Sequence, residues 1–283
     1  MELPTICFVF PYLFIGISII LHIVIFLLIL KFVPNVEKLP FLWGMINWTI
    51  AIGVLFFGIM NLLPIDHNSL LHGFIGGIIP PITEDVGRLI VFTFIYKSKN
   101  HNFNNSLIFG AGHGGWESIG LISIDMIPLL MNFYAIKNAK DEEELKEKEL
   151  IKTYELYKNG VTGGDIFGLF TRFLGNFFHM GASVIIYRFS LNRKEKKYMI
   201  FFILLFVSHF CVDFTYQIIN IYELNMLFNL VFVGIIDILI IVIGWFVWKE
   251  NNNKEYSDYN FEGDDSEAGA LIDIKEMNEN KIE

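Results

Sequence analysis

The segment GAGHGGWESIG, residues 110–120, places an imidazole and a carboxylate inside an apolar run that continues to about residue 134. His113 and Glu117 are four residues apart, so a helix would carry both side chains on one face. A carboxylate at the middle of a bilayer costs about 2.5 to 3.5 kcal/mol even on the most lenient insertion scale, so Glu117 must face protein or trapped water. The glycines of the segment would let a neighbouring helix or a substrate approach the pair closely.

A second group of ionisable side chains lies near the middle of the apolar stretch 70–96, within the sequence PPITEDVGRLIVF. Glu84 and Arg88 can form an ion pair across one helical turn, and Asp85 lies beside them. Such a pair either locks helices together or takes part in chemistry, and both roles stay open at this point. Ionisable residues inside a membrane are nonetheless functional candidates by default.

Two later apolar stretches carry polar residues at helical spacing. The stretch at about 165–188 has polar groups at successive spacings of four, three and four, namely Arg172, Asn176, His179 and Ser183. The stretch at about 198–219 has them at spacings of four, namely His209, Asp213 and Gln217. Because each mid-membrane histidine shares a stripe with a polar residue four positions on, the pattern indicates a site rather than unrelated core histidines.

The remaining polar residues of the apolar stretches are isolated. His22 lies in the first stretch, and Asn47 and Asn61 lie in the second. We interpret these three as polar groups that help helices to pack. Asp237 stands alone in the last stretch, and we favour a structural role for it over a catalytic one.

The composition shows what kind of scaffold holds these groups. The chain has 283 residues, of which 54% are hydrophobic and 16% aromatic, which excludes an ordinary soluble domain. We expect an all-α, polytopic membrane bundle, because each apolar stretch can cross a hydrocarbon core about 30 Å thick. Seven helices are expected, at about 6–30, 41–63, 70–96, 106–134, 165–188, 198–219 and 225–248. They form one domain, residues 1–250, with its core at about 70–220, followed by an acidic, disordered tail at 251–283.

The loops predict how the chain is oriented in the membrane. The loops after the first, third and fifth stretches contain Lys and Arg, whereas PIDHNS and IYEL contain neither. This alternation predicts an N-terminus outside and a C-terminus in the cytoplasm of a multi-pass protein, most simply in the plasma membrane. The charged loop at about 137–163 mixes both signs and predicts a solvated surface helix. The two cysteines, Cys7 and Cys211, both lie in apolar stretches and support neither a disulfide framework nor a thiolate metal site.

Imidazoles and carboxylates are the ligands of catalytic zinc sites, which keep one position open for water. Four consecutive stretches supply enough of them for such a site and its supporting contacts: Glu84, His113, Glu117, His179, His209 and Asp213. A glutamate beside the metal can act as general base on water, which would allow hydrolysis inside a membrane. Arg88 would keep Glu84 ionised and oriented, or would donate to a developing oxyanion. A hydrogen-bond network without metal stays an alternative, as do a proton or cation transporter and a non-catalytic scaffold.

At these residues the chain resembles the YhfC family of intramembrane metalloproteases. That family is related to the CAAX-processing and bacteriocin-processing proteases, to PrsW and to the multi-spanning scaffold subunit of gamma-secretase. The resemblance covers about residues 75–220 and rests on four segments in the family's order, TEDVGR, FGAGHGGWES, TRFLGNFFHMGAS and HFCVDF. The second segment also has the superfamily's spacing from Phe109 to His113. Two positions depart from the family pattern, because Asp85 and Thr171 each stand where a glutamate is usual.

The resemblance implies a four-helix catalytic core, formed by the third to the sixth stretch. It implies that Glu84 is the general base and that the histidines His113, His179 and His209 contact a divalent metal, most simply zinc, or the transition state. Arg88, Glu117 and Asp213 complete the expected catalytic set, and Asp213 would orient His209. The expected substrate is a membrane-embedded or juxtamembrane peptide within the lipid bilayer, and no nucleic-acid partner is expected.

Overall fold

A computed structural model of the chain describes residues 2–66, 69–96, 102–222 and 231–251. Within these ranges the regular elements are helices and no β-strand is present. This confirms the expected all-α membrane bundle. The acidic tail, for which we expected disorder, lies outside the described residues except for its first residue.

The first half of the chain forms three long helical segments, and the third of them carries Glu84, Asp85 and Arg88. The first span is α1 (Thr5–Phe32), and the second is one continuous helix of α2 (Leu39–Trp48), the π-helix η1 (Thr49–Phe56) and α3 (Phe57–Leu62). The third is α4 (Leu70–Ile90), extended by the π-helix η2 (Val91–Ile95). Ser69 caps α4, since its hydroxyl accepts a hydrogen bond from the His72 backbone N–H at 3.1 Å.

The second half of the chain supplies four more long helices and two short ones. They are α5 (Asn105–Asn138), α6 (Glu142–Glu147), α7 (Ile151–Tyr157), α8 (Gly163–Leu191) and α9 (Lys196–Tyr222), followed by a last helix at Val231–Asn251. By length and composition, 6 helices in the described part can cross a membrane. The helix formed by α4 and η2 is not among them, because Glu84, Asp85 and Arg88 interrupt its apolar character. Its length of about 39 Å, at 1.5 Å per residue, still matches the expected third span.

Contacts near helix ends identify one end of the bundle. We call it the basic end because it carries Lys31, Lys38, Arg188, Arg193 and Lys197. The Asn105 side chain donates to Glu37 Oε1 at 3.0 Å, which joins the start of α5 to the loop after α1. Arg188 Nη1 donates to Asn251 Oδ1 at 2.6 Å, which places the end of the last helix beside the end of α8. Consecutive spans therefore run in alternating directions.

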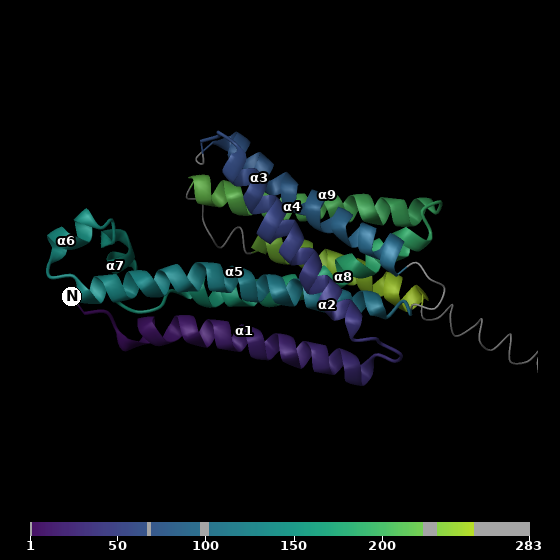
Figure 1. The fold of residues 1–283 in the computed structure, drawn as a ribbon, viewed down its shortest axis with the longest axis horizontal. Coiled ribbons are helices and arrows are strands. Elements are labelled where there is room, and N and C mark those ends of the chain that lie inside the picture. Colours follow the sequence, from purple (N-terminus) through teal and green to yellow (C-terminus); the bar gives the residue numbers. More distant parts are fainter. Residues whose placement is uncertain (1, 67–68, 97–101, 223–230, 252–283) are drawn as a thin grey trace, which may run out of the picture.

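The opposite end of the bundle is the α6–α7 end, where the N-terminus also lies (Figure 1). The Leu145 and Tyr157 side chains of α6 and α7 are buried against Phe133 and Ile136 of α5. The Cys7 thiol at the start of α1 donates to the Tyr157 carbonyl at 3.5 Å. The expected solvated surface helix is therefore divided into two short helices, whose charged side chains are mostly exposed and whose apolar side chains complete a small core.

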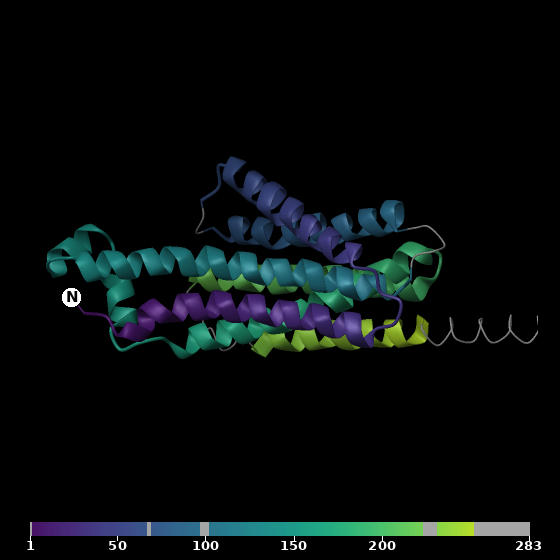
Figure 2. The ribbon, with the colours of Figure 1, turned by 60° about the horizontal axis from the view of Figure 1, so that its bottom comes forward.

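Helix α5 lies at the centre of the packing. It contacts α1, α2 and α8 extensively, while α4 packs along α9 (Figures 1 and 2). The glycines of α5 allow these contacts, because a Cβ at Gly110 would lie 2.6 Å from the His179 carbonyl oxygen of α8. A Cβ at Gly112 would overlap the Phe41 carbonyl of α2. The expected close approach of neighbouring backbones at this segment is confirmed.

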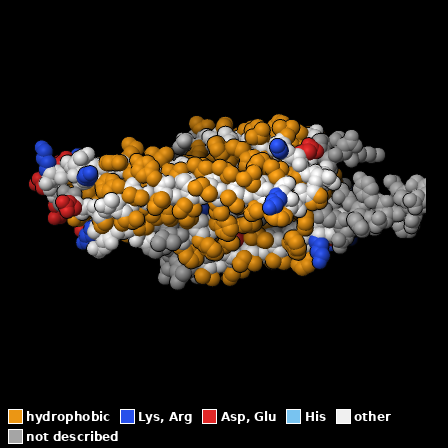
Figure 3. Space-filling view, turned by 90° about the horizontal axis from the view of Figure 1, so that it is seen from below, with side chains coloured by type: hydrophobic (Ala, Val, Ile, Leu, Met, Phe, Trp, Pro, Cys, Tyr) orange, Lys and Arg blue, Asp and Glu red, His pale blue; other side chains and the backbone are white. Residues whose placement is uncertain are grey.

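Apolar side chains cover the middle of the molecule, and charged side chains gather toward its two ends (Figure 3). Leu28 of α1, Phe94 of η2 and Phe246 of the last helix are 47%, 79% and 64% exposed. Such exposure would destabilise a protein in water but suits contact with acyl chains. The chain is therefore an integral membrane protein.

Candidate functional site

Helix α4 contributes a buried ionic group to the centre of the bundle. Glu84, Asp85 and Arg88 are at most 2% exposed. Arg88 Nη2 lies 3.1 Å from Glu84 Oε2, and Arg88 Nη1 donates to Asp85. The ion pair expected between Glu84 and Arg88 is therefore present, and it extends to Asp85. Because buried charges are stable only when paired, Arg88 lets both carboxylates remain in this apolar setting.

Helix α5 brings His113 against this group. Its Nε2 lies 2.8 Å from Glu84 Oε2 and 4.0 Å from Glu117 Oε2, one turn further along α5. The other ring nitrogen, Nδ1, lies 3.2 Å from the Asn47 amide nitrogen of α2. The same amide nitrogen donates to the Glu84 backbone carbonyl at 3.3 Å. Asn47 therefore ties the His113 ring to α4.

Helix α8 places His179 between a cation and a carboxylate. Its Nδ1 lies 2.6 Å from Arg88 Nη2, and its Nε2 lies 2.6 Å from Glu117 Oε2. A guanidinium has only donors, so Nδ1 accepts and Nε2 is the ring atom that faces Glu117. Arg172, two turns before His179, approaches Glu117 Oε1 at 3.9 Å.

Helix α9 supplies the third histidine from the other side of Glu84. His209 Nδ1 lies 3.2 Å from Asp85 Oδ2, while its Nε2 lies 3.8 Å from Glu84 Oε2. Asp213, one turn further along α9, has its Oδ2 3.5 Å from the same Nε2. Asp213 therefore lies at the edge of the cluster and contacts it through His209.

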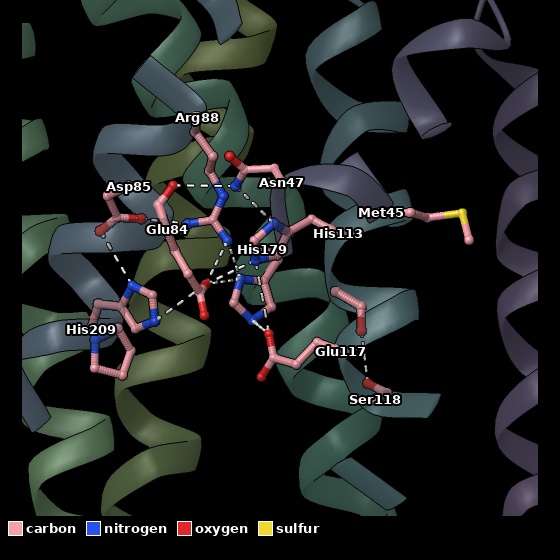
Figure 4. Close-up of polar contacts among 12 residues, drawn as sticks. Met45, Asn47, Glu84, Asp85, Arg88, His113, Glu117, Ser118, His179 and His209 are labelled. Atoms are coloured by element: carbon pink, nitrogen blue, oxygen red, sulfur yellow. Dashed lines mark hydrogen bonds and ion pairs between the residues drawn. The ribbon is translucent and has the colours of Figure 1, made fainter. Parts of the chain in front are cut away.

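Figure 4 shows the outcome of these contacts. The side chains from α4, α5, α8 and α9 point toward one another, and Glu84 lies between the histidines. All seven candidate residues expected from the sequence meet in one buried cluster, six within it and Asp213 at its edge. The helices hold them there by the close approach of α5 to α2 and α8.

A family of known proteins matches a range that includes all of these residues. The sequence model of the YhfC intramembrane metalloprotease family matches residues 17–237, which is well over half of the chain. The chain belongs to this family. An uncharacterized membrane protein YhfC of Bacillus subtilis (strain 168) is 33% identical over 78 residues, which are 28% of this chain and 30% of that protein. The matched stretch thus spans less than a third of that relative's length. No solved structure matches the chain.

A metalloprotease of the YhfC family needs a place for a divalent metal, and the cluster offers suitable donors. Glu84, His113, Glu117 and His179 each provide one ligand atom, and these atoms all lie within 4.8 Å of one another. Two imidazoles and two carboxylates are ligand types that zinc accepts. The two short contacts from Nε2 to a carboxylate, at His113 and His179, are places where a metal could replace a shared proton. His209 lies outside this group of four.

Asn47 is the contact in this YhfC family site that sequence reasoning missed. It was expected only to help helices pack, yet its amide meets both His113 and the backbone of Glu84. The available signal was its position in the middle of an apolar span. His22 fits the packing interpretation, since it is buried and a Cβ at Gly115 would meet its ring at 2.6 Å. Asn61 does not, because it is exposed at the end of α3.

Two buried polar side chains beside the site lack a hydrogen-bond partner among the described residues. They are Asn176 and Ser183 of α8, both 0% exposed, which flank His179 on its stripe. Asp237 of the last helix is also buried, at 3% exposed. Asp237 does not belong to the group of four possible metal ligands that includes Glu84, and its structural role stays a prediction.

Proposed function

We propose that this YhfC family member is a metal-dependent endopeptidase that hydrolyses a peptide bond within or beside the membrane. The observation that carries the proposal is the position of Glu84 Oε2, 2.8 Å from His113 Nε2 and held by Arg88 at 3.1 Å, inside a cluster with metal-ligand spacing. A purely structural ion pair would not need three histidines around it. The Bacillus subtilis relative is uncharacterized, so the proposal depends on this chain's own residues.

The metal would be held by His113, Glu117 and His179. Glu84 would then not be needed as a ligand and could act on the attacking water. When bound, such an ion supplies Lewis acidity, which activates water and the peptide carbonyl. We assign His209 to the substrate rather than to the metal, because it lies outside the group of four possible ligands, while Asp85 holds its Nδ1 and so directs its Nε2 into the cluster. This assignment divides the three histidines between the two roles expected of them, contact with the metal and contact with the transition state.

Glu84 is the proposed general base. Its Oε2 would accept a proton from the attacking water and return it to the amine nitrogen of the leaving peptide half. Arg88 orients this carboxylate through the contact at 3.1 Å, and its positive charge favours the ionised form of Glu84. Asp85 in turn holds both Arg88 and His209, so it positions two partners of the base without touching the substrate.

The proposed substrate is a membrane-embedded or juxtamembrane peptide. We further propose the plasma membrane as the location, with the N-terminus and α6–α7 outside and the basic end in the cytoplasm. The basic loops at one end of the bundle support this orientation.

The experiment compares the wild-type protein with Glu84→Gln, which removes the base and keeps most of its volume. Membranes from cells lacking the protein are incubated with each purified, zinc-loaded variant, and new peptide termini are identified by mass spectrometry. We expect termini that appear with the wild type and with the exposed control Glu143→Gln, but not with Glu84→Gln. Identical termini with Glu84→Gln would refute the assigned role of Glu84.

A further inference from the structure

The cluster is sealed on one side and partly exposed on the other. The side chains of its inner members are at most 6% exposed, namely Glu84, Asp85, Arg88, His113, His179 and His209. The side chains of Glu117, Arg172 and Asp213 are 17%, 29% and 29% exposed. The accessible edge of the site is therefore made by these three charged residues.

All three exposed residues are displaced from their histidines in the same direction. Glu117 follows His113 by four residues on α5, and Asp213 follows His209 by four on α9. Helices α5 and α9 both start at the basic end, so these residues lie nearer the α6–α7 end. Arg172 precedes His179 on α8, which runs the opposite way, so its displacement points to the same end.

The burial of α5 and α8 changes at the level of the histidines. On α8, no residue between 167 and 175 is buried, whereas between 176 and 187 all but Phe177 and Met180 are buried. On α5, Ser118 and Ile122 are the two buried residues between 116 and 132, whereas residues 108–115 are all buried. The helices are tightly packed from the basic end up to the cluster and more open beyond it.

An aromatic layer closes the cluster toward the basic end. Phe92 lies two turns beyond Glu84, and Phe109 lies one turn before His113. Their ring centroids are 4.7 Å apart, and the Tyr187 ring of α8 lies 5.0 Å from Phe92. All three rings are at most 2% exposed, so they place a buried apolar layer between the cluster and the basic end.

We propose that the substrate peptide and the water for its hydrolysis reach Glu84 from the α6–α7 end, past Glu117, Arg172 and Asp213. The inference rests on the proposed peptidase function and adds the side of entry. The scissile bond then lies in the half of the bilayer next to α6 and α7, or just beyond it. With the orientation proposed above, this is the outer half.

The face of α8 between its start and His179 offers positions for a test. Gly168 and Gly175 share this face with Arg172, at helical spacings of four and three. A Cβ at either glycine would meet no atom within 4 Å, so a cysteine fits there without displacing a neighbour. Neither glycine belongs to the cluster.

The test is labelling of single cysteines by a charged, membrane-impermeant thiol reagent. In full-length protein with Cys7→Ala and Cys211→Ala, each probe is treated in intact cells and in inverted vesicles. Glu143→Cys marks the α6–α7 end, and Lys194→Cys marks the basic end. We expect Gly168→Cys and Gly175→Cys to react from the same side as Glu143→Cys.

A buried control completes the experiment. Ile186→Cys, on the sealed part of α8 at 0% exposure, should stay unlabelled from both sides. Labelling of Gly175→Cys from the Lys194→Cys side would overturn the proposal. So would its failure to react from either side, because a thiol facing only lipid does not meet a charged reagent. Labelling needs no cleavage, so this result is independent of whether Glu84→Gln proves inactive.

Discussion

Arg88 and His179 meet directly, with Arg88 Nη2 2.6 Å from His179 Nδ1. The contact joins α4 to α8 across 91 positions of sequence and decides which ring atom of His179 faces the cluster. Because arginine only donates hydrogen bonds, Nδ1 must accept, and Nε2 is presented to Glu117 at 2.6 Å. The same arginine thereby orients the proposed base Glu84 and one proposed metal ligand.

Removal of Arg88 should destabilise the protein as well as abolish activity. Arg88→Met leaves Glu84 and Asp85 buried without their cation, and breaking a buried ion pair typically costs about 3 to 5 kcal/mol. Lys194→Met, at the exposed basic end, should change stability by no more than about 0.5 kcal/mol. Thermal unfolding in detergent measures both effects. Equal midpoints for the two variants would show that the buried pairing does not stabilise the bundle.

The two histidines of the proposed metal site should differ in zinc affinity. A neutral imidazole that binds metal through Nε2 carries its proton on Nδ1 and needs an acceptor there. Turning the Asn47 amide would give His113 an acceptor at the cost of the hydrogen bond from Asn47 to the Glu84 carbonyl, whereas Arg88 offers His179 only donors. Metal analysis should therefore show a larger zinc loss in His113→Ala than in His179→Ala. A greater loss in His179→Ala would reverse the ranking.

Asn47 should influence zinc binding without being a ligand. Loss of a residue that orients a metal-binding histidine lowers metal affinity by about 10- to 100-fold, and we expect this range for Asn47→Leu. Asn61→Leu, at the exposed end of the same span, is the matched control and should bind zinc as the wild type does. Competition with a zinc chelator measures the two affinities. Unchanged zinc binding in Asn47→Leu would show that Asn47 only helps the helices to pack, as was first expected.

Asp213 should matter less than the histidine it contacts. Its carboxylate is partly exposed and approaches His209 Nε2 only at 3.5 Å. Asp213→Asn should therefore keep its zinc and retain more peptide cleavage than His209→Ala. Zinc content and the yield of new termini test this together. If Asp213→Asn lost its zinc, Asp213 would have to be a ligand.

Close packing of α5 against α2 should make Gly112 intolerant of any side chain. Gly112→Ala would push a methyl group into the Phe41 carbonyl, and overpacking of this kind costs about 1 to 3 kcal/mol. Gly175→Ala meets no atom within 4 Å and should be neutral or slightly stabilising. Unfolding midpoints of the two variants in detergent provide the comparison. Equal stability would show that α2 and α5 can separate freely at this point.

The sequence alone was enough to predict which residues could take part in chemistry. Charged and polar side chains such as Glu84, His113 and His209 stand out within apolar stretches because a bilayer penalises them at every position along a span. The spans could also be predicted from the sequence, because an apolar run must be long enough to cross a membrane of fixed thickness. Their helical spacing also predicted that His113 and Glu117 share one face.

The sequence by itself thus determined the helical membrane bundle and the set of residues that its interior must accommodate. Only the tertiary structure decided their partners: Arg88 with His179, Asn47 with His113, and Asp85 with His209. It also decided that the site is closed toward the basic end and open at Asp213. The physical reason is that hydropathy and helical spacing are local properties, whereas the rotation and close approach of each helix depend on contacts between residues far apart in the chain.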